Sequence, residues 1–246
     1  MEQFFNTYFD FGIMGDYFGD VLNGFWWTIR LSVFGGVLAL IWGLILSVLR
    51  QLPGRLLSPI RILAIAYIDA LRGIPMLLTL LLIAGGLGTL ASQDAIPKEI
   101  GIPNWLGYPD PFWYGVMALT LTYGAYMAEV YRAGIEAVPR GQMEAARSLG
   151  MSHGQAMRYV IVPQAVRKVI PPLLNDFIAL MKDTSLVSVL GFVEVVQVGQ
   201  DVYSETFNPS ALTLGAIMFL VFTIPLARLT DWLIKRQESK FERGIP

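Results

Sequence analysis

The sequence predicts an all-α membrane protein with five transmembrane helices, an N-terminus outside the cytoplasm and a C-terminus inside it. The chain has 246 residues, of which 54% are hydrophobic and 15% charged, and this is too apolar for a soluble domain of its length. A helix needs about 20 mostly apolar residues to cross a bilayer. The blocks that reach this length are residues 25–49, 59–87, 112–135, 169–190 and 211–234.

The charges on either side of the second block set the orientation. Arg50, Arg55 and Arg61 precede it, whereas the segment that follows, 92–111, is acidic apart from Lys98. Because Lys and Arg collect on the cytoplasmic side of a membrane, the two flanks lie on opposite faces and the number of crossings between them is odd. The block is long enough for one bent helix or two short ones, and one crossing is the simpler interpretation.

The same charge bias organises the rest of the chain. Basic residues crowd the segment 139–168 and follow the last block, so both regions are expected in the cytoplasm. We therefore expect an extracytoplasmic segment 1–24, a transmembrane domain 25–236 and a cytoplasmic tail 237–246.

The first twenty residues are acidic and contain no Lys or Arg, which is the wrong charge for a signal peptide. The first apolar helix is thus expected to remain in the mature protein. The segment is also rich in Phe and Tyr, so it either lies along the outer membrane interface or forms a mobile tail.

Several functions are excluded by what the sequence lacks. There is no Cys and only one His, so neither a thiolate metal site nor a multi-histidine centre can be built. That residue, His153, is interpreted as a surface residue without a function. The sequence has no phosphate-binding loop, so any nucleotide chemistry belongs to a partner. We expect no catalytic residue, no metal and no cofactor in this chain.

Charged residues inside a spanning helix usually face a partner or a wet cavity. Asp69 and Arg72 lie three residues apart and so on one helix face, and Gly73 and Pro75 follow at once. A proline there leaves backbone carbonyls free, which requires protein or water to satisfy them. This is either a break in the helix that contacts substrate or a kink stabilised by a local Asp69–Arg72 pair.

Two further blocks carry polar residues. Glu129 can pair with Arg132 one turn away, so a structural role is as reasonable as a pathway role. Lys182 and Asp183 are adjacent, and adjacent helical residues face different neighbours. The complete set of candidates for the substrate pathway is Asp69, Arg72, Gly73, Pro75, Tyr126, Glu129, Lys182, Asp183, Thr184 and Ser185.

The cytoplasmic segment is predicted to form a compact knob of two short helices. Residues 142–149 are strong helix formers, and Gly150 is placed to stop them. Ser152 and Gln155 make a capping box for a second short helix, which Pro163 is expected to end. An ordinary amphipathic connector is the alternative.

The composition of the first short helix favours a docking role. Ala145 and Ala146 are expected to offer a small-residue face for close approach, and Glu144 and Arg147 can pair with charges on a partner.

The knob resembles a motif of a known family. Glu144, Ala145, Ala146 and Gly150, followed by Pro163, are similar to the E-A-A…G…I-x-L-P loop of the membrane subunits of ABC importers. Val160 and Val162 replace Ile and Leu and keep apolar bulk. The resemblance implies a coupling helix that docks into a groove of an ATPase subunit through Gln142, Glu144, Ala145, Ala146, Arg147, Leu149 and Gly150.

Segments 67–75, 124–135 and 170–189 resemble permeases for polar amino acids. Asp69 stands where that pattern has Glu, and Ile74 where it has Thr, so a hydroxyl is lost. The resemblance implies import of glutamine, glutamate or a basic amino acid. Arg72 and Lys182 are candidates for binding the substrate carboxylate, and Asp69, Glu129 and Asp183 are candidates for binding its ammonium or for structural pairing.

The same resemblance implies several partners in a bacterial inner membrane. They are two ATPase subunits that carry ATP and Mg²⁺, a second permease subunit that is identical or related, an extracytoplasmic amino-acid-binding protein and membrane lipid, with no nucleic acid. Two alternatives stay open. One is a permease of the same architecture for another small solute, and the other is a non-ABC membrane receptor or enzyme with a cytoplasmic adaptor loop.

Overall fold

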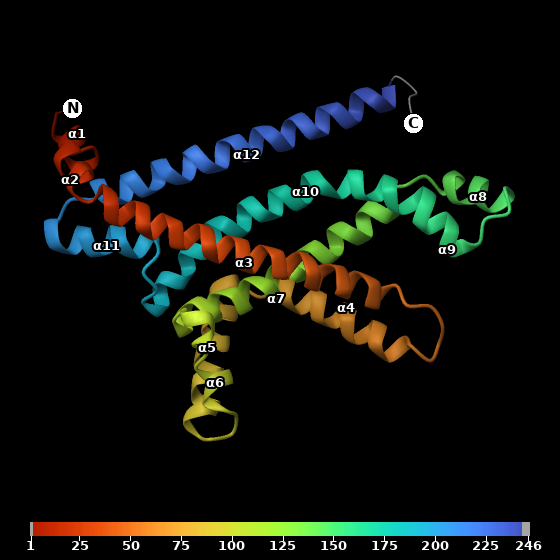
Figure 1. Cartoon of the computed structure of the whole chain (residues 1–246), viewed down its shortest axis with the longest axis horizontal. Helices are drawn as coiled ribbons and strands as arrows, with labels where there is room; N and C mark the ends of the chain where they lie inside the picture. The colour runs from red at the N-terminus through yellow and green to blue at the C-terminus, as the bar shows by residue number, and fades with distance from the viewer. Residues whose placement is uncertain (1, 243–246) are drawn as a thin grey trace.

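The computed structural model describes the backbone of residues 2–242 and the side chains of residues 3–236, and every regular element in that part of the chain is helical. Four long helices, α3, α7, α10 and α12, form the body, while α5 and α6 extend to one side (Figure 1). The α-helices are α1 (Glu2–Tyr8), α2 (Phe11–Asp16), α3 (Phe18–Arg50), α4 (Ser58–Gly73), α5 (Met76–Ser92), α6 (Lys98–Gly101), α7 (Asp110–Glu136), α8 (Arg140–Ser148), α9 (His153–Ala156), α10 (Val162–Asp183), α11 (Val195–Thr206) and α12 (Ser210–Glu242).

Two of the described helices, α3 and the Ser210–Arg236 part of α12, are long and apolar enough to cross a membrane, and α4 with α5 qualifies as a bent pair. The other two long helices, α7 and α10, are more polar. The prediction of an all-helical membrane protein is therefore confirmed, and five crossings remain a prediction.

The core is built around α7, which packs along α3. Phe112 and Leu119 of α7 are fully buried, as is Leu31 of α3. The two helices approach closely where glycines face one another: a Cβ atom on Gly43 would lie 2.8 Å from the carbonyl oxygen of Gly124. Small residues permit this kind of contact between membrane helices.

The element expected at 59–87 is not one helix. It consists of α4 and α5, which meet at an angle of 109°. Ile74 is extended, with φ −94° and ψ 132°, and Pro75 precedes the first turn of α5. The cause is local, because a proline disfavours helical backbone in the residue before it. Of the two interpretations of this block, two short helices is the one that the structure shows.

The expectation that Pro163 ends the second short helix is wrong. That helix, α9, runs through a π-helical turn, Met157–Ile161, directly into α10. Pro163 lies in the first turn of α10, directly after this π-helical turn. A proline inside a helix removes one backbone hydrogen bond, and here the helix continues with a local irregularity instead of ending. The block expected at 169–190 is accordingly α10 followed by the 3₁₀ helix Thr184–Leu190.

The first segment is attached to the body. The backbone N–H of Asp10 donates to Ser210 Oγ at 2.9 Å, and Asn208 Nδ2 donates to the carbonyl of Asn6 at 3.0 Å. The first long helix begins at Phe18, before the expected boundary at residue 25. In the region predicted as a tail, α12 continues to Glu242, and residues 243–246 lie outside the described residues.

The two ends of the molecule are formed by different helices. One end holds α1, α2 and α11, and the other holds α8, α9, the α3–α4 turn and the end of α12 (Figure 1). Three basic segments that are far apart in the sequence thus lie at the same end, as the charge bias predicts.

Candidate functional site

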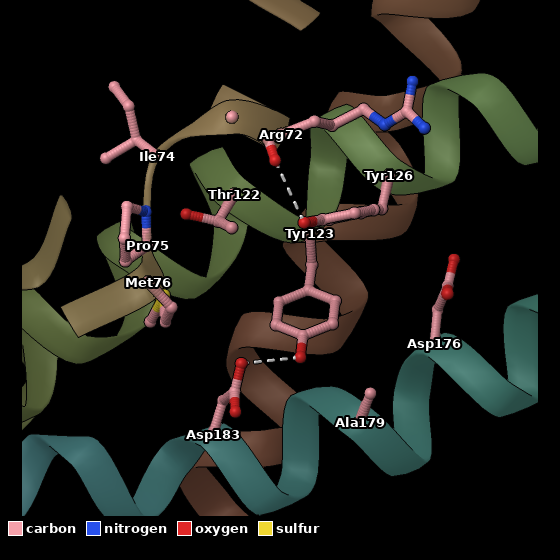
Figure 2. A pocket seen from close by; sticks show the side chains of 11 residues that line it. Arg72, Ile74, Pro75, Met76, Thr122, Tyr123, Tyr126, Asp176, Ala179 and Asp183 are labelled. Atoms are coloured by element: carbon pink, nitrogen blue, oxygen red, sulfur yellow. Dashed lines mark hydrogen bonds between the residues drawn. The ribbon is translucent and has the colours of Figure 1, made fainter. Parts of the chain in front are cut away.

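An open pocket of about 450 Å³ lies where the α4–α5 break faces α7 and α10 (Figure 2). Its lining consists of Arg72, Gly73, Ile74, Pro75, Met76, Thr122, Tyr123, Tyr126, Asp176, Ala179 and Asp183. Three helical segments from distant parts of the chain therefore build one site.

The broken helix supplies free backbone to the pocket wall. In a continuous helix the carbonyl of Arg72 would accept a hydrogen bond from the residue four positions on, but the chain turns away at Pro75. The hydroxyl of Tyr126 donates to this carbonyl instead, at 3.3 Å. A tyrosine of α7 thus stabilises the break that opens the site.

The α10 wall contributes two carboxylates. Asp183 Oδ2 accepts a hydrogen bond from the hydroxyl of Tyr123 at 2.8 Å. Asp176 Oδ2 is buried and has no hydrogen-bond partner among the described residues, and the same is true of Thr122 Oγ1. Such orphaned polar atoms are costly unless a ligand or water satisfies them.

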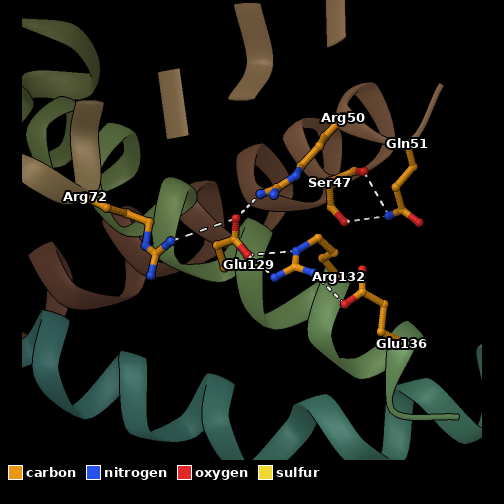
Figure 3. A network of polar contacts seen from close by, with 7 residues as sticks. All are labelled: Ser47, Arg50, Gln51, Arg72, Glu129, Arg132 and Glu136. Atoms are coloured by element: carbon orange, nitrogen blue, oxygen red, sulfur yellow. Dashed lines mark hydrogen bonds and ion pairs between the residues drawn. The ribbon is translucent and has the colours of Figure 1, made fainter. Parts of the chain in front are cut away.

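Arg72 lines the pocket, and its side chain runs from the α4–α5 break toward Tyr126 of α7 (Figure 2). The guanidinium lies over the ring of Tyr126, 5.7 Å from the centroid, and 3.9 Å from Glu129 (Figures 2 and 3). Glu129 also pairs with Arg50 and, at 2.8 Å, with Arg132. The carboxylate of Glu129 is therefore shared among three arginines from three helices.

The structure brings five of the predicted pathway residues to the pocket and leaves five outside it. The five that line it are Arg72, Gly73, Pro75, Tyr126 and Asp183. The five that do not are Asp69, Glu129, Lys182, Thr184 and Ser185.

The contacts and orientation of these residues explain why they do not line the pocket. Asp69 is exposed and, within the described chain, forms no ion pair with Arg72, so the proposed local pair is wrong. Lys182 is exposed because its neighbour Asp183 takes the inward position. The hydroxyls of Thr184 and Ser185 donate to the α10 carbonyls of the residues three positions earlier, at 2.7 Å each.

Thr122, Tyr123 and Asp176 line the pocket, but the set of pathway residues predicted from the sequence does not include them. A usable signal was present for Asp176, because it lies seven residues before Asp183 and two helical turns bring both to the same face. The side chains from α7 follow from tertiary packing, which the sequence alone did not indicate.

The knob has the predicted ends. Leu149 is the C-cap of α8, and Gly150 follows with a φ of +84°, a conformation that favours glycine. The capping box is present: Gln155 N donates to Ser152 Oγ at 3.2 Å, and Ser152 N donates to Gln155 Oε1 at 2.8 Å. Both local predictions are confirmed.

One face of α8 is occupied by the chain itself. Ala146 is 4% exposed, and Met143 packs on a small cluster around Ile161. The expectation that Ala146 offers a face to a partner is therefore wrong, because it faces inward. Of the residues predicted to dock on the ATPase, those that are exposed are Gln142, Glu144, Ala145, Arg147, Leu149 and Gly150, and Leu149 is 85% exposed.

A polar pocket at a broken membrane helix, together with an exposed helical knob at one end of the molecule, defines a membrane-embedded transport subunit. The chain belongs to the family of binding-protein-dependent transport system inner membrane components, whose model matches residues 39–239. The resemblance to membrane subunits of ABC importers is thereby confirmed.

Two curated relatives cover nearly the whole chain. One is a probable glutamine ABC transporter permease, GlnM of Bacillus subtilis (strain 168), 34% identical over 230 residues that make up 93% of this chain and 98% of GlnM. The other is a probable amino-acid ABC transporter permease, PatM of Vibrio harveyi, 36% identical over 236 residues that make up 96% of this chain and 99% of PatM.

Solved structures agree with the fold. The chain matches the crystal structure of an amino acid ABC transporter with histidines at a TM-score of 0.78 and 34% identity, over 91% of this chain and 96% of that one. A methionine ABC transporter in an inward-facing conformation matches at a TM-score of 0.65 and 17% identity, over 88% and 95% of the two chains, which shows the fold alone.

Proposed function

We propose that this chain is the transmembrane subunit of an ATP-driven ABC importer that carries a polar amino acid across the bacterial inner membrane. The observation that carries the proposal is the pocket at the α4–α5 break, which combines an arginine, two aspartates and two tyrosines. These groups match the carboxylate and ammonium of an amino acid. Relatives named as permeases for glutamine, arginine and glutamate support the same class of substrate.

The pathway in this proposal runs past Arg72, Gly73, Pro75, Tyr126 and Asp183, which line the pocket. Asp176 joins them from α10. Glu129 acts on the pathway through Arg72, since the two lie 3.9 Å apart.

The knob formed by α8 and α9 is the proposed coupling element. Glu144, Arg147 and Leu149 are exposed on it, and an ATPase groove with complementary charge would accept them. Two ATPase subunits would hold ATP and Mg²⁺, because this chain has no phosphate-binding loop. Closure of these subunits favours one permease conformation over the other only if ATP binds the two states with different affinity.

The proposed topology has five crossings, with the N-terminus outside and the knob inside. The position of α1 and α2 at one end, with the α12 terminus at the other, supports an odd number of crossings (Figure 1). An extracytoplasmic amino-acid-binding protein would then deliver substrate to the end that holds α11. A second permease subunit, identical or related, would complete the wall of a pocket that is open in the single chain.

The test is ATP-dependent uptake into vesicles that contain the permease, its ATPase and its binding protein, with a panel of labelled amino acids. Uptake of at least one polar amino acid that requires ATP is the expected result. Failure with every polar amino acid would overturn the choice of substrate class, and uptake by the permease alone without ATP would overturn the ABC mechanism.

A further inference from the structure

Arg30, in the first half of α3, has no charged partner within the described chain. It is half-buried and forms neither an ion pair nor a hydrogen bond with another described residue. Its guanidinium carbon lies 4.7 Å from the ring centroid of Trp27 and 5.4 Å from that of Trp26. A charged side chain on a membrane-spanning helix is costly unless a polar or anionic group meets it. Arg30 therefore requires a partner from outside this part of the chain.

The position of Arg30 along α3 matches the level of a lipid headgroup. Residues 31–49 contain no charged side chain, and Arg50 follows them. From Arg30 to Arg50 the helix rises about 30 Å, which is the thickness of a hydrocarbon core. The guanidinium of Arg30 points back toward Trp26 and Trp27, away from this apolar run, as a snorkelling arginine does. Its charge is thus placed at one boundary of the hydrocarbon.

An exposed apolar stripe continues along α3 from this boundary. Its members recur at intervals of three or four residues and so share one helix face with Trp26 and Arg30. They are Val33, Val37, Ile41, Leu44 and Val48, which are between 48% and 55% exposed. The face that packs on the protein is a different one, since Leu31 and Ala39 are fully buried. The stripe is a surface on which an acyl chain can lie below a headgroup.

The protein holds the aromatic part of this site in place. The ring of Trp27 meets the rings of Tyr108, Phe112 and Phe192 edge-on, with centroids 5.5 to 6.3 Å apart. A guanidinium that rests on a fixed ring is preorganised and loses less freedom when it binds a ligand. Its N–H groups are suited to a phosphate, which an arginine binds in a bidentate manner.

We propose that Arg30, Trp26 and this stripe form a binding site for one glycerophospholipid. The guanidinium binds the phosphate diester, Trp26 packs on the glycerol and ester region, and an acyl chain lies on Val33, Val37 and Ile41. The rise from Arg30 to Ile41 is about 16 Å, which is close to half of a hydrocarbon core and hence to one leaflet. In the proposed topology this is the outer leaflet, whereas the site itself does not depend on that orientation.

Two other occupants match the surface less well. Inorganic phosphate would meet the guanidinium but leave the stripe uncovered. A second copy of the chain, packed on the stripe through a twofold axis normal to the membrane, would bring the same arginine to the same depth. The stripe contains no carboxylate that could pair with it. A phospholipid supplies both the anion and the apolar cover.

The test is native mass spectrometry of the purified permease–ATPase complex, titrated with dioleoylphosphatidylglycerol or with dioleoylglycerol, which has the same acyl chains and no phosphate. We expect the phospholipid to bind at least about tenfold more tightly, and Arg30→Gln to remove this difference and one bound phospholipid per permease subunit. The matched control is Lys98→Gln, at an exposed lysine of α6 without a neighbouring ring, which should bind lipid like the wild type. Retention of the ATPase shows that each variant is folded.

A second measurement reports what covers the stripe. The chain has no cysteine, so Val37→Cys accepts a nitroxide label at a single position of the permease in nanodiscs. We expect this label to be accessible to oxygen, which concentrates in lipid, and shielded from a water-soluble nickel chelate.

Three results would overturn the inference. Shielding of the label from both reagents would show that protein covers the stripe. Equal lipid retention by Arg30→Gln and the wild type would remove the phosphate contact, and displacement of the lipid by inorganic phosphate would indicate an anion site alone. None of these measurements involves amino-acid transport, so they are independent of the proposed substrate.

Discussion

The guanidinium of Arg72 lies 3.9 Å from the carboxylate of Glu129, beside the pocket that the backbone of Arg72 helps to form. The end of α4 is thereby tied to α7, and α7 leads within a few residues to the knob at Arg140. This contact connects the proposed substrate site with the proposed site of ATPase docking.

Replacement of Glu129 should destabilise the protein. Glu129→Gln leaves Arg50, Arg72 and Arg132 without their shared carboxylate in a half-buried site, and loss of one member of such a cluster costs about 3 kcal/mol. Thermal unfolding of the purified complex measures the effect. The matched control is Glu136→Gln, whose side chain is 62% exposed and pairs with Arg132 alone, and which should cost about 0.5 kcal/mol. An equal loss of stability in the two variants would contradict the role of Glu129 as the shared partner of three arginines.

The contact between α3 and α7 should not tolerate a methyl group. In Gly43→Ala the new Cβ would meet the Gly124 carbonyl at 2.8 Å and Met127 Cβ at 2.9 Å, and overpacking of this kind costs about 1 to 3 kcal/mol. Gly85→Ala is the control, because no heavy atom lies within 4 Å of its added Cβ. A lower unfolding midpoint for Gly43→Ala alone is the expected result, and identical midpoints would show that the helices separate freely.

The coupling role of the knob predicts a loss of partner binding. Glu144→Arg reverses an exposed charge on α8, and Gly150→Asp places a side chain at a φ of +84°, so both should reduce co-purification of the ATPase at least about tenfold while the permease still folds. Gly88→Ala is the control, since Gly88 lies on α5, outside the knob, and its added Cβ meets no heavy atom within 4 Å beyond its own helix. Stoichiometric ATPase with both Glu144→Arg and Gly150→Asp would refute the assignment.

Glu194 should make stability depend on pH. It lies between the last two predicted spans, is fully buried and caps α11 by accepting from the amides of Val196 and Gln197 at 2.8 and 2.9 Å. Burial raises the pKa of Glu194 from 4.5 to about 7, although these amides act in the opposite direction. The folded state then binds more protons than the unfolded state between these pH values, so the free energy of unfolding falls as pH rises from about 4.5 to 7, by about 3 kcal/mol at most.

Thermal unfolding at a series of pH values tests this. Glu194→Gln should flatten the fall between pH 5 and 7.5, because the amide does not titrate. A slope that is unchanged in the variant would assign the dependence to another group.

Local chemistry explains which features could be predicted from the sequence. The capping box at Ser152 and the stop at Gly150 depend on residues within one turn, and both are present. The helical blocks follow from hydropathy, which reports burial in lipid or protein without regard to neighbours. Even the break before Pro75 is local, although its angle of 109° depends on what α5 packs against.

The residues that were misplaced depend on distant parts of the chain. Glu129 was paired with Arg132 correctly, but its contact with Arg50 joins residues of two different helices. Hydropathy treated Lys182 and Asp183 alike, and only the orientation of α10 against α7 decides that Asp183 lies inside. The prediction that Pro163 ends a helix is wrong because the sequence did not indicate the π-helical turn Met157–Ile161, which joins α9 to α10.

The most direct test of the account is ATP-driven amino-acid uptake by reconstituted vesicles that carry Arg72→Gln. The account predicts at least about tenfold slower uptake with the ATPase subunit still bound and still hydrolysing ATP, because the change removes a charge beside the pocket and leaves the knob intact. Arg228→Gln, at an 80% exposed arginine of α12, is expected to transport like the wild type. Normal uptake by Arg72→Gln would contradict the placement of the transport site at the α4–α5 break.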